Sequence, residues 1–360
     1  MSAPSSTSST FATCVERLLA DLKYRYQPLP PPNADFWDPF HQWMFCTLGP
    51  TTSWSEKRLA ELEHASGGII ERGYPYADTE VQLLYAKVTA LAILVDDIMD
   101  DEATCVELAQ FSHKLFLGEP QKNSMLALYH ATLKEVSHLF EGSEVMRDMA
   151  VIPWIVFIDG CLVEKQMFLS QQDSDAPKAT HLEGLAPNFP RYLRGRSGAS
   201  ESYVAGIFKA AKAQNLPVDR IIKIFPDAVF FCDVVNDILS FYKEELAGET
   251  HNFIHIRTRS LASAGKRGSG PAGEWTAHDT LRLLCQELLE ATRRVDGVLR
   301  LEECERKMRG EVSDGVDDLD VEIAKQWRGW RDGYISWHFE CRRYKLNSSG
   351  VTTGVPAISV

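Results

Sequence analysis

Residues 81–101 read VQLLYAKVTALAILVDDIMDD, an apolar-rich stretch that ends in a group of aspartates. Apolar side chains recur in it at intervals of three and four residues, which predicts a helix with one buried face. These side chains are Val81, Leu84, Tyr85, Val88, Ala92 and Val95. Because residues four apart share a helix face, the same stripe continues into Asp96 and Asp100. Two carboxylates are therefore predicted to point where the core side chains point.

The burial of these carboxylates indicates a metal site. A buried carboxylate without a partner loses much of its hydration energy, and a bound cation is the simplest compensation. Oxygen ligands suit Mg²⁺, which keeps several waters and bridges to substrate phosphates. In the alternative, the helix ends here and Asp96, Asp97, Asp100 and Asp101 form a solvated acidic terminus. Asp is a poor helix former, and the helix dipole disfavours it at a C-terminus.

A second group of oxygen donors lies in the stretch VFFCDVVNDILSFY, residues 229–242, which is apolar on nearly all sides. Asn236, Ser240 and Glu244 follow one another at intervals of four, so an amide, a hydroxyl and a carboxylate share one helix face. They could chelate one hard cation, although a core Asn or Ser is often satisfied by backbone groups. Together the two motifs predict a diphosphate held between two helices by several Mg²⁺ ions.

Most of the remaining sequence also predicts helices. Helical periodicity recurs in segments 123–141, 145–169, 200–214, 226–246, 278–309 and 318–346, and alternating strand patterns are nearly absent. We therefore expect one all-α domain over residues 35–346. Residues 1–34, which include the Pro-rich stretch Pro28–Pro32, are expected to form a flexible segment and linker, and residues 347–360 a loose tail.

Composition excludes several classes of protein. A net charge of −12 argues against a nucleic-acid surface, which needs clustered Lys and Arg. We find no apolar run long enough for a membrane span. Eight cysteines occur without a CxxC pair, and no secretion signal is evident, so we expect a cytoplasmic protein with reduced thiols. Gly268–Gly273 formally matches GxGxxG, but it lies in the polar segment 257–273 without a preceding strand, which indicates a mobile surface loop.

Four stretches of the chain resemble the class I terpene cyclases, in which an aspartate-rich motif opposes an N-x3-S-x3-E motif. They are VDDIMDD at 95–101, FPRYLR at 189–194, VNDILSFYKE at 235–244 and GYISWHFECRRY at 333–344. Their order and spacing are similar, over about residues 35–346, to those of the trichodiene synthase-like fungal sesquiterpene cyclases. Trichodiene synthases have a Lys at the position of Met99, so we expect a different product here.

The resemblance implies a class I terpenoid-synthase helical bundle around a central active-site cavity, with three Mg²⁺ ions and farnesyl diphosphate as substrate. It implies that Asp96 is a direct metal ligand, and that Asp97 and Asp100 support the ligands or meet Arg343 on closure. The candidate metal ligands on the second helix are Asn236, Ser240 and Glu244. The candidate diphosphate-binding residues are Arg194, Lys243, Arg343 and Tyr344. A homodimer is a further expectation carried by the resemblance. Without it, the arginines could equally be ordinary solvated charges.

A carbocation also needs a dry cavity, whose aromatic walls stabilise it by roughly 2 kcal/mol or more when desolvated. The candidate wall residues are Phe157, Phe230, Phe231, Tyr334 and Trp337, with Trp154 and Tyr74 as weaker ones; each could instead be ordinary core. The predicted function is thus a Mg²⁺-dependent sesquiterpene cyclase. The alternatives are a chain-elongating isoprenyl diphosphate synthase, which expects a second aspartate-rich motif, and a catalytically inactive helical binding protein.

Overall fold

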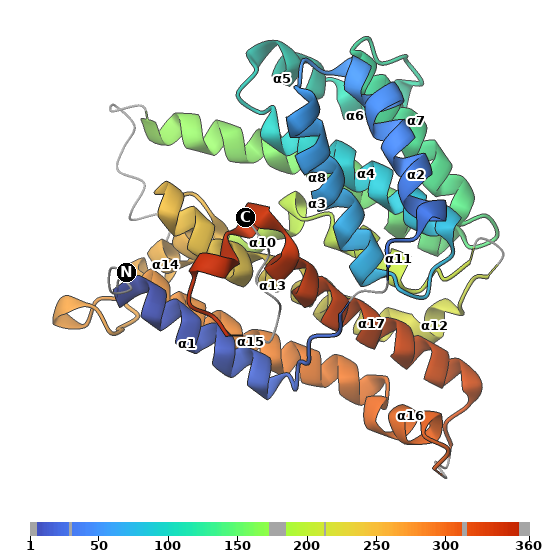
Figure 1. The fold of residues 1–360 in the computed structure, drawn as a ribbon. Helices are drawn as coiled ribbons and strands as arrows, with labels where there is room; N and C mark the ends of the chain where they lie inside the picture. The colour runs from blue at the N-terminus through green and yellow to red at the C-terminus, as the bar shows by residue number, and fades with distance from the viewer. Residues whose placement is uncertain (1–5, 29–30, 173–184, 212–213, 312–314, 353–360) are drawn as a thin grey trace.

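The computed structural model describes residues 6–28, 31–172, 185–211, 214–311 and 315–352, which form helices and turns and no strand (Figure 1). The α-helices in the first half of the chain are α1 (Ser6–Asp21), α2 (Ala34–Trp43), α3 (Glu56–Gly73), α4 (Thr79–Asp97), α5 (Glu102–Leu108), α6 (Phe111–Leu117), α7 (Ser124–Leu139) and α8 (Glu144–Gln172). Those in the second half are α10 (Phe189–Ser197), α11 (Ser200–Ile207), α12 (Val218–Ile221), α13 (Phe225–Ala247), α14 (Phe253–Ser263), α15 (Ala277–Val298), α16 (Leu301–Met308) and α17 (Asp318–Glu340). Short helical turns are η1 (Met44–Leu48), η2 (Gly49–Thr51), η3 (Ile222–Ile224), η4 (Pro271–Gly273), η5 (Arg342–Tyr344) and η6 (Leu346–Ser348). The predicted all-α fold is confirmed.

Six helices form a closed ring. Helix α3 packs on α4, α4 on α8, α8 on α11, α11 on α13, α13 on α17, and α17 returns to α3. Outside the ring, α2 and α7 pack on α4, while α15 covers α13 and is itself covered by α1 (Figure 1). Of the helices in the described parts of the chain, none has the length and apolarity that a membrane crossing requires.

Helix α4 forms as the apolar stripe predicted, and all six stripe side chains are buried. Asp78 caps its N-terminus by accepting a hydrogen bond from the Val81 amide. The helix ends at Asp97, with Ile98 as its C-cap. Asp100 therefore lies beyond the helix, and the prediction that it shares a helix face with Asp96 was wrong. The apolar run that sustains the helix stops at Val95, and the Asp residues that follow favour a helix end.

Helices α3 and α17 approach each other backbone to backbone. A Cβ atom on Gly333 would lie 1.9 Å from the Arg72 carbonyl oxygen, and one on Gly73 would lie 2.6 Å from the Trp330 ring, so only glycine fits at either position. The buried Arg72 side chain donates from Nε to Glu340 Oε2 at 2.7 Å. This contact fixes the C-terminal half of α17, which carries several residues of the candidate site.

The expectation of a flexible segment over residues 1–34 was wrong for α1. Phe11 and Val15 are fully buried, and the Phe11 ring stacks on Tyr242 at a centroid distance of 5.6 Å. The apolar residues of α1 recur at helical spacing, which gives it a face that packs on α15 and α13. Residues 1–5 and 29–30 lie outside the described ranges.

The expectation of a loose tail over residues 347–360 was wrong for residues 347–352, which the structure describes. Tyr242 donates from its hydroxyl to the Ser348 carbonyl at 2.8 Å, and Ser349 is fully buried. The tail therefore packs against α13 as far as these residues. Residues 353–360 lie outside the described ranges.

The segment 257–273 is also better ordered than its composition suggested. Its first residues belong to α14, and the remainder turns back onto Asp279 of α15. The Asp279 carboxylate accepts hydrogen bonds from the Ser269 amide at 3.0 Å and the Ser269 hydroxyl at 2.8 Å. The formal GxGxxG of Gly268–Gly273 thus lies in an anchored surface turn and not between a strand and a helix.

Phe11→Ala tests whether α1 is part of the folded core. Removing a fully buried Phe leaves a cavity, so the free energy of unfolding is expected to fall by about 3–5 kcal/mol. Arg17→Ala on the same helix is the control, because that side chain is 85% exposed; it should change stability by less than about 0.5 kcal/mol. Urea denaturation followed by circular dichroism measures both. Equal, small effects would contradict the packing of α1.

Candidate active site

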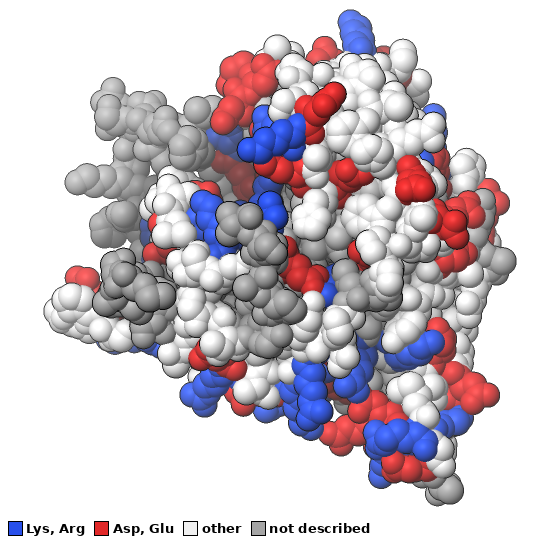
Figure 2. Space-filling view, viewed as in Figure 1, with Lys and Arg blue, Asp and Glu red and all other residues white. Residues whose placement is uncertain are grey.

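A cavity of about 870 Å³ lies inside the ring of helices. Residues of α3, α4, α8, α10, α11, α13, α14 and α17 line it, together with Arg343 and Tyr344 of η5. Both predicted motifs reach it, since Asp96, Asp100, Asn236 and Glu244 are among the lining residues. Figure 2 shows acidic and basic side chains intermingled on this face of the molecule, between α5 and α14.

The aspartate motif meets an arginine from the C-terminal segment. Arg343 Nη2 lies 3.0 Å from Asp97 Oδ1 and 3.8 Å from Asp96 Oδ2. The Asp96 side chain is 57% exposed, but this exposure is toward the cavity. Burial raises the pKa of Asp96, and the Arg343 guanidinium opposes the rise. Asp97 lies outside the cavity lining and pairs with Arg343, while Asp100 lines the cavity.

The second motif lies on α13 as predicted. Asn236 Nδ2 donates to the Tyr344 hydroxyl oxygen at 3.0 Å and lies 3.3 Å from His338 Nε2. Ser240 is buried, one helical turn further on. Burial raises the pKa of Glu244, and the Lys243 ammonium, 3.8 Å from Glu244 Oε1, opposes the rise. The cavity therefore has amide and carboxylate oxygen donors on the side of α13.

These donors fit a Mg²⁺ ion only if water and substrate phosphate supply the rest of its ligands. Among the described residues, no group of three or more His, Cys, Asp or Glu side chains could hold a metal ion by itself. The donors that line the cavity are Asp96 and Asp100 on one side and the Asn236 amide and Glu244 carboxylate on α13; Ser240, between the last two along the helix, is buried and lies outside the lining. Mg²⁺ commonly takes one or two carboxylates and completes its shell with water and substrate phosphate. This mixed oxygen set matches that preference.

Arg194 lines the cavity, but it also forms a buried ion cluster with α13. Its Nε lies 2.8 Å and 3.0 Å from the two Asp237 carboxylate oxygens, and its Nη1 lies 3.2 Å from Asp233 Oδ1. One guanidinium thus holds two carboxylates from consecutive turns of α13. The sequence prediction assigned Arg194 to the diphosphate alone and missed both aspartates.

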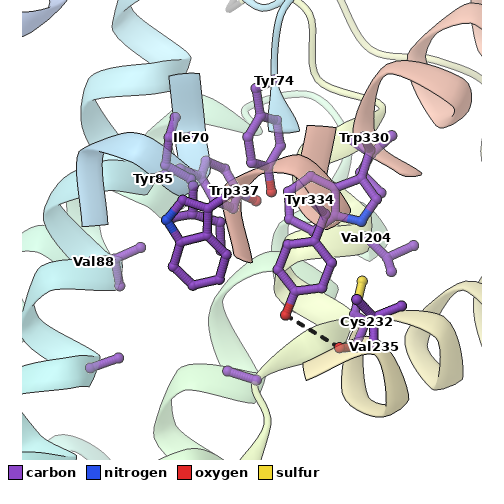
Figure 3. Close-up of a cluster of buried hydrophobic side chains, with 14 of the residues drawn as sticks. Ile70, Tyr74, Tyr85, Val88, Val204, Cys232, Val235, Trp330, Tyr334 and Trp337 are labelled. Atoms are coloured by element: carbon purple, nitrogen blue, oxygen red, sulfur yellow. Dashed lines mark hydrogen bonds between the residues drawn. The ribbon is translucent and has the colours of Figure 1, made fainter. Parts of the chain in front are cut away.

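Three of the five main wall candidates line the cavity, namely Phe157, Tyr334 and Trp337. The weaker candidate Trp154 lines it as well. The polar atoms of two of these side chains point to neighbouring backbone, since Tyr334 donates to the Cys232 carbonyl at 3.3 Å and Trp337 Nε1 to the Ala65 carbonyl at 3.0 Å. Figure 3 shows the Tyr334 hydroxyl directed at Cys232. The rings therefore contribute faces, and not donors, to the cavity wall.

Phe230, Phe231 and the weaker candidate Tyr74 do not line the cavity, so this part of the prediction was wrong. Phe231 is fully buried and packs edge-on against Trp327 at 5.2 Å. Phe230 lies under the Arg191 guanidinium, 5.1 Å from its ring centroid. Both precede Asn236 by five or six residues, which turns them to other faces of α13.

The sequence prediction also missed several groups in the cavity. Thr89 Oγ1 and the Tyr203 hydroxyl, 2.9 Å apart, place a polar pair in the wall. Lys165 Nζ donates to the Met99 carbonyl at 2.7 Å, so it ties the aspartate loop to α8. Glu164 lines the cavity, and burial raises its pKa. Their only sequence signal was a polar residue within or beside an apolar helix.

Comparison with known proteins identifies several fungal relatives. Terpene synthase BipA from Cochliobolus sativus is 29% identical over 274 residues, which cover 76% of this chain and 71% of that protein. Longiborneol synthase from Gibberella zeae is 29% identical over 282 residues, covering 77% and 70%. (E)-β-farnesene synthase from Metarhizium brunneum is 25% identical over 297 residues, covering 82% and 77%. No protein-family model matches the chain.

Several solved structures share the fold of this chain. The linalool/nerolidol synthase from Streptomyces clavuligerus, in complex with 2-fluorogeranyl diphosphate, aligns with a TM-score of 0.60 and 14% identity, over 86% of this chain and 100% of that one. The germacradien-4-ol synthase from Streptomyces citricolor aligns with a TM-score of 0.56 and 16% identity, over 88% and 97%. The predicted class I fold is confirmed, while the narrower likeness to trichodiene synthases stays a prediction.

Arg194→Met tests the buried ion cluster. It leaves Asp233 and Asp237 without their counterion, so the free energy of unfolding is expected to fall by about 3–5 kcal/mol. Burial already raises the pKa of both carboxyls and Arg194 opposes the rise; without Arg194 both pKa values rise further. The folded variant then binds more protons than the unfolded chain above about pH 4. Its stability should therefore fall as pH increases.

Urea denaturation at about pH 5 and about pH 8 measures this effect, and the deficit relative to the unsubstituted protein should be larger at the higher pH. Arg191→Met, an exposed neighbour on α10, is the control and should change stability by less than about 1 kcal/mol. A deficit that shrinks as pH rises would argue against uncompensated carboxylates.

Proposed function

We propose that this chain, a terpene synthase with the class I fold, is a magnesium-dependent sesquiterpene cyclase that ionises farnesyl diphosphate and closes the carbocation into a cyclic product. The observation that carries the proposal is the juxtaposition of the Asp96–Arg343 pair with Asn236 and Glu244 around one aromatic-walled cavity. The relatives named for longiborneol and β-farnesene support the farnesyl skeleton. The second of these names denotes a linear product, so cyclisation rests on the resemblance and the enclosed cavity.

The proposed division of roles follows from the positions of the side chains. Asp96 would hold metal on the α4 side, and Asn236, Ser240 and Glu244 on the α13 side. Bound Mg²⁺ supplies Lewis-acid neutralisation of the charge that develops on the departing diphosphate. Direct contacts to the diphosphate oxygens would come from the cationic and hydroxyl groups of Arg194, Lys243, Arg343 and Tyr344.

Ionisation breaks the bond between the terminal carbon and the diphosphate oxygen, and the electron pair leaves with that oxygen. The carbocation remains in the cavity, where Phe157, Tyr334 and Trp337 present ring faces that exclude water and offer cation–π stabilisation. An internal double bond attacks the cationic carbon to close a ring. The final cation loses a proton to give a hydrocarbon, or takes up water and then loses a proton to give an alcohol.

Arg194 would have to serve both Asp237 and the diphosphate. Its guanidinium has five N–H donors in a planar fork, and one on each of its three nitrogens already serves α13. An arriving diphosphate would therefore compete with a buried carboxylate for one cation. Binding of the leaving group and the position of α10 would be coupled in this way.

The direct test is incubation of the purified protein with farnesyl diphosphate and Mg²⁺, followed by gas chromatography and mass spectrometry of the organic extract. A cyclic C15 hydrocarbon or alcohol is expected. The double variant Asn236→Ala with Glu244→Ala should lower turnover by at least about 100-fold, because it removes ligands that stabilise the leaving group. Glu245→Gln is the matched control, since Glu245 pairs with His255 at 3.1 Å.

Each of the other possible outcomes would overturn a different part of the proposal. Cyclic product that survives the double variant would defeat the assigned metal site. A preference for geranylgeranyl diphosphate, supplied in parallel, would overturn the substrate. Longer linear diphosphates on addition of isopentenyl diphosphate would favour chain elongation. Absence of product, together with no Mg²⁺-dependent diphosphate binding by calorimetry, would favour an inactive binding protein.

A further inference from the structure

A buried histidine adjoins the α13 metal ligands without any role in the reaction described above. His338 of α17 is fully buried, and three aromatic rings enclose it, those of Tyr334, Trp337 and Tyr344, at centroid distances of 4.6, 4.5 and 4.5 Å. It lies beneath Asn236, where a charged side chain would be expected to disturb a cation site.

The backbone fixes which nitrogen of this ring carries the hydrogen. His338 Nδ1 lies 2.8 Å from the Tyr334 carbonyl oxygen. A carbonyl oxygen can only accept, so Nδ1 carries the hydrogen and donates it. The three aromatic rings around His338 offer no counter-charge to a second proton, so this apolar enclosure disfavours the imidazolium form. The other nitrogen, Nε2, is therefore a lone-pair acceptor.

That acceptor determines the orientation of the Asn236 amide. The atom 3.3 Å from His338 Nε2 must be the NH₂ group of Asn236, because its carbonyl oxygen would meet a lone pair there. The second N–H of the same group points to the Tyr344 hydroxyl oxygen, 3.0 Å away. Both amide hydrogens are then used, and among the described residues Asn236 Oδ1 makes no hydrogen bond.

We propose that His338 is a positioning residue, which holds the Asn236 amide so that Oδ1 faces the cavity as a cation ligand. The same chain of hydrogen bonds makes the Tyr344 oxygen an acceptor, so the Tyr344 hydroxyl hydrogen is left for an anionic oxygen in the cavity. One backbone carbonyl thus sets the direction of three successive hydrogen bonds. This inference rests on the proposed function, since it assigns the cation and the diphosphate to this cavity.

The first test compares His338→Gln with His338→Phe. Gln can place an amide oxygen near the position of Nε2 and so keep an acceptor for Asn236, whereas Phe removes it at similar volume. Binding of Mn²⁺ in the presence of inorganic diphosphate, measured by electron paramagnetic resonance, is expected to weaken about 10–100-fold in His338→Phe. In His338→Gln it should stay within a few-fold of the unsubstituted protein. His255→Phe is the control, since His255 pairs with Glu245.

The kinetic prediction follows the same pattern. The Mg²⁺ concentration for half-maximal turnover should rise in His338→Phe and recover in His338→Gln. Equal Mn²⁺ binding in the Phe variant and the unsubstituted protein, with both folded by circular dichroism, would overturn the proposal. If the unsubstituted protein forms no product, the proposed function fails instead, so the two failures are distinguishable.

A second measurement determines the His338 tautomer in the unsubstituted protein and uses a variant only to assign the resonance. In the unsubstituted protein labelled with ¹⁵N-histidine, the resonance that disappears in His338→Gln belongs to His338. It should show the neutral Nδ1–H tautomer between about pH 6 and pH 8, with an unprotonated Nε2. An Nε2–H tautomer or an imidazolium in that range would overturn the proposal.

Discussion

The structure depends on compensation of charge inside an apolar ring of helices. A carboxylate that is buried there loses hydration and is compensated only if an opposite charge is within reach. Two arginines are each shared by two aspartates, one group being buried and the other partly exposed to the cavity. Arg194 joins α10 to Asp233 and Asp237 of α13, and Arg343 joins the C-terminal segment to Asp96 and Asp97 at the end of α4.

These shared arginines lie beside the two oxygen-donor motifs, which line opposite sides of one cavity. The end of α4 and the beginning of η5 are far apart in the chain, and Arg343 brings them together. The Asn236–Tyr344 hydrogen bond then connects η5 to α13. A diphosphate that bound here would contact three segments already connected by polar contacts, so less ordering would be needed on binding.

The wall of the cavity follows from a second constraint, the satisfaction of buried polar atoms. Tyr334 and Trp337 direct their polar atoms to carbonyl groups of neighbouring helices, which leaves their ring faces toward the space. His338 follows the same rule. The Tyr334 carbonyl sets its tautomer, and that tautomer sets the orientation of the Asn236 amide. The close approach of α3 and α17, which requires Gly73 and Gly333, positions all three residues.

The sequence by itself determined the helical class, the course of α4 up to Asp97, and the two oxygen-donor motifs, because each follows from the spacing of side chains along a single helix. Tertiary structure decided the rest. It turned Phe230 and Phe231 away from the cavity, docked α1 through Phe11, and paired Arg194 with two aspartates that the sequence prediction had not assigned. Periodicity shows which residues share a face of one helix, whereas a cavity, an ion pair or a tautomer depends on which face of another helix packs opposite.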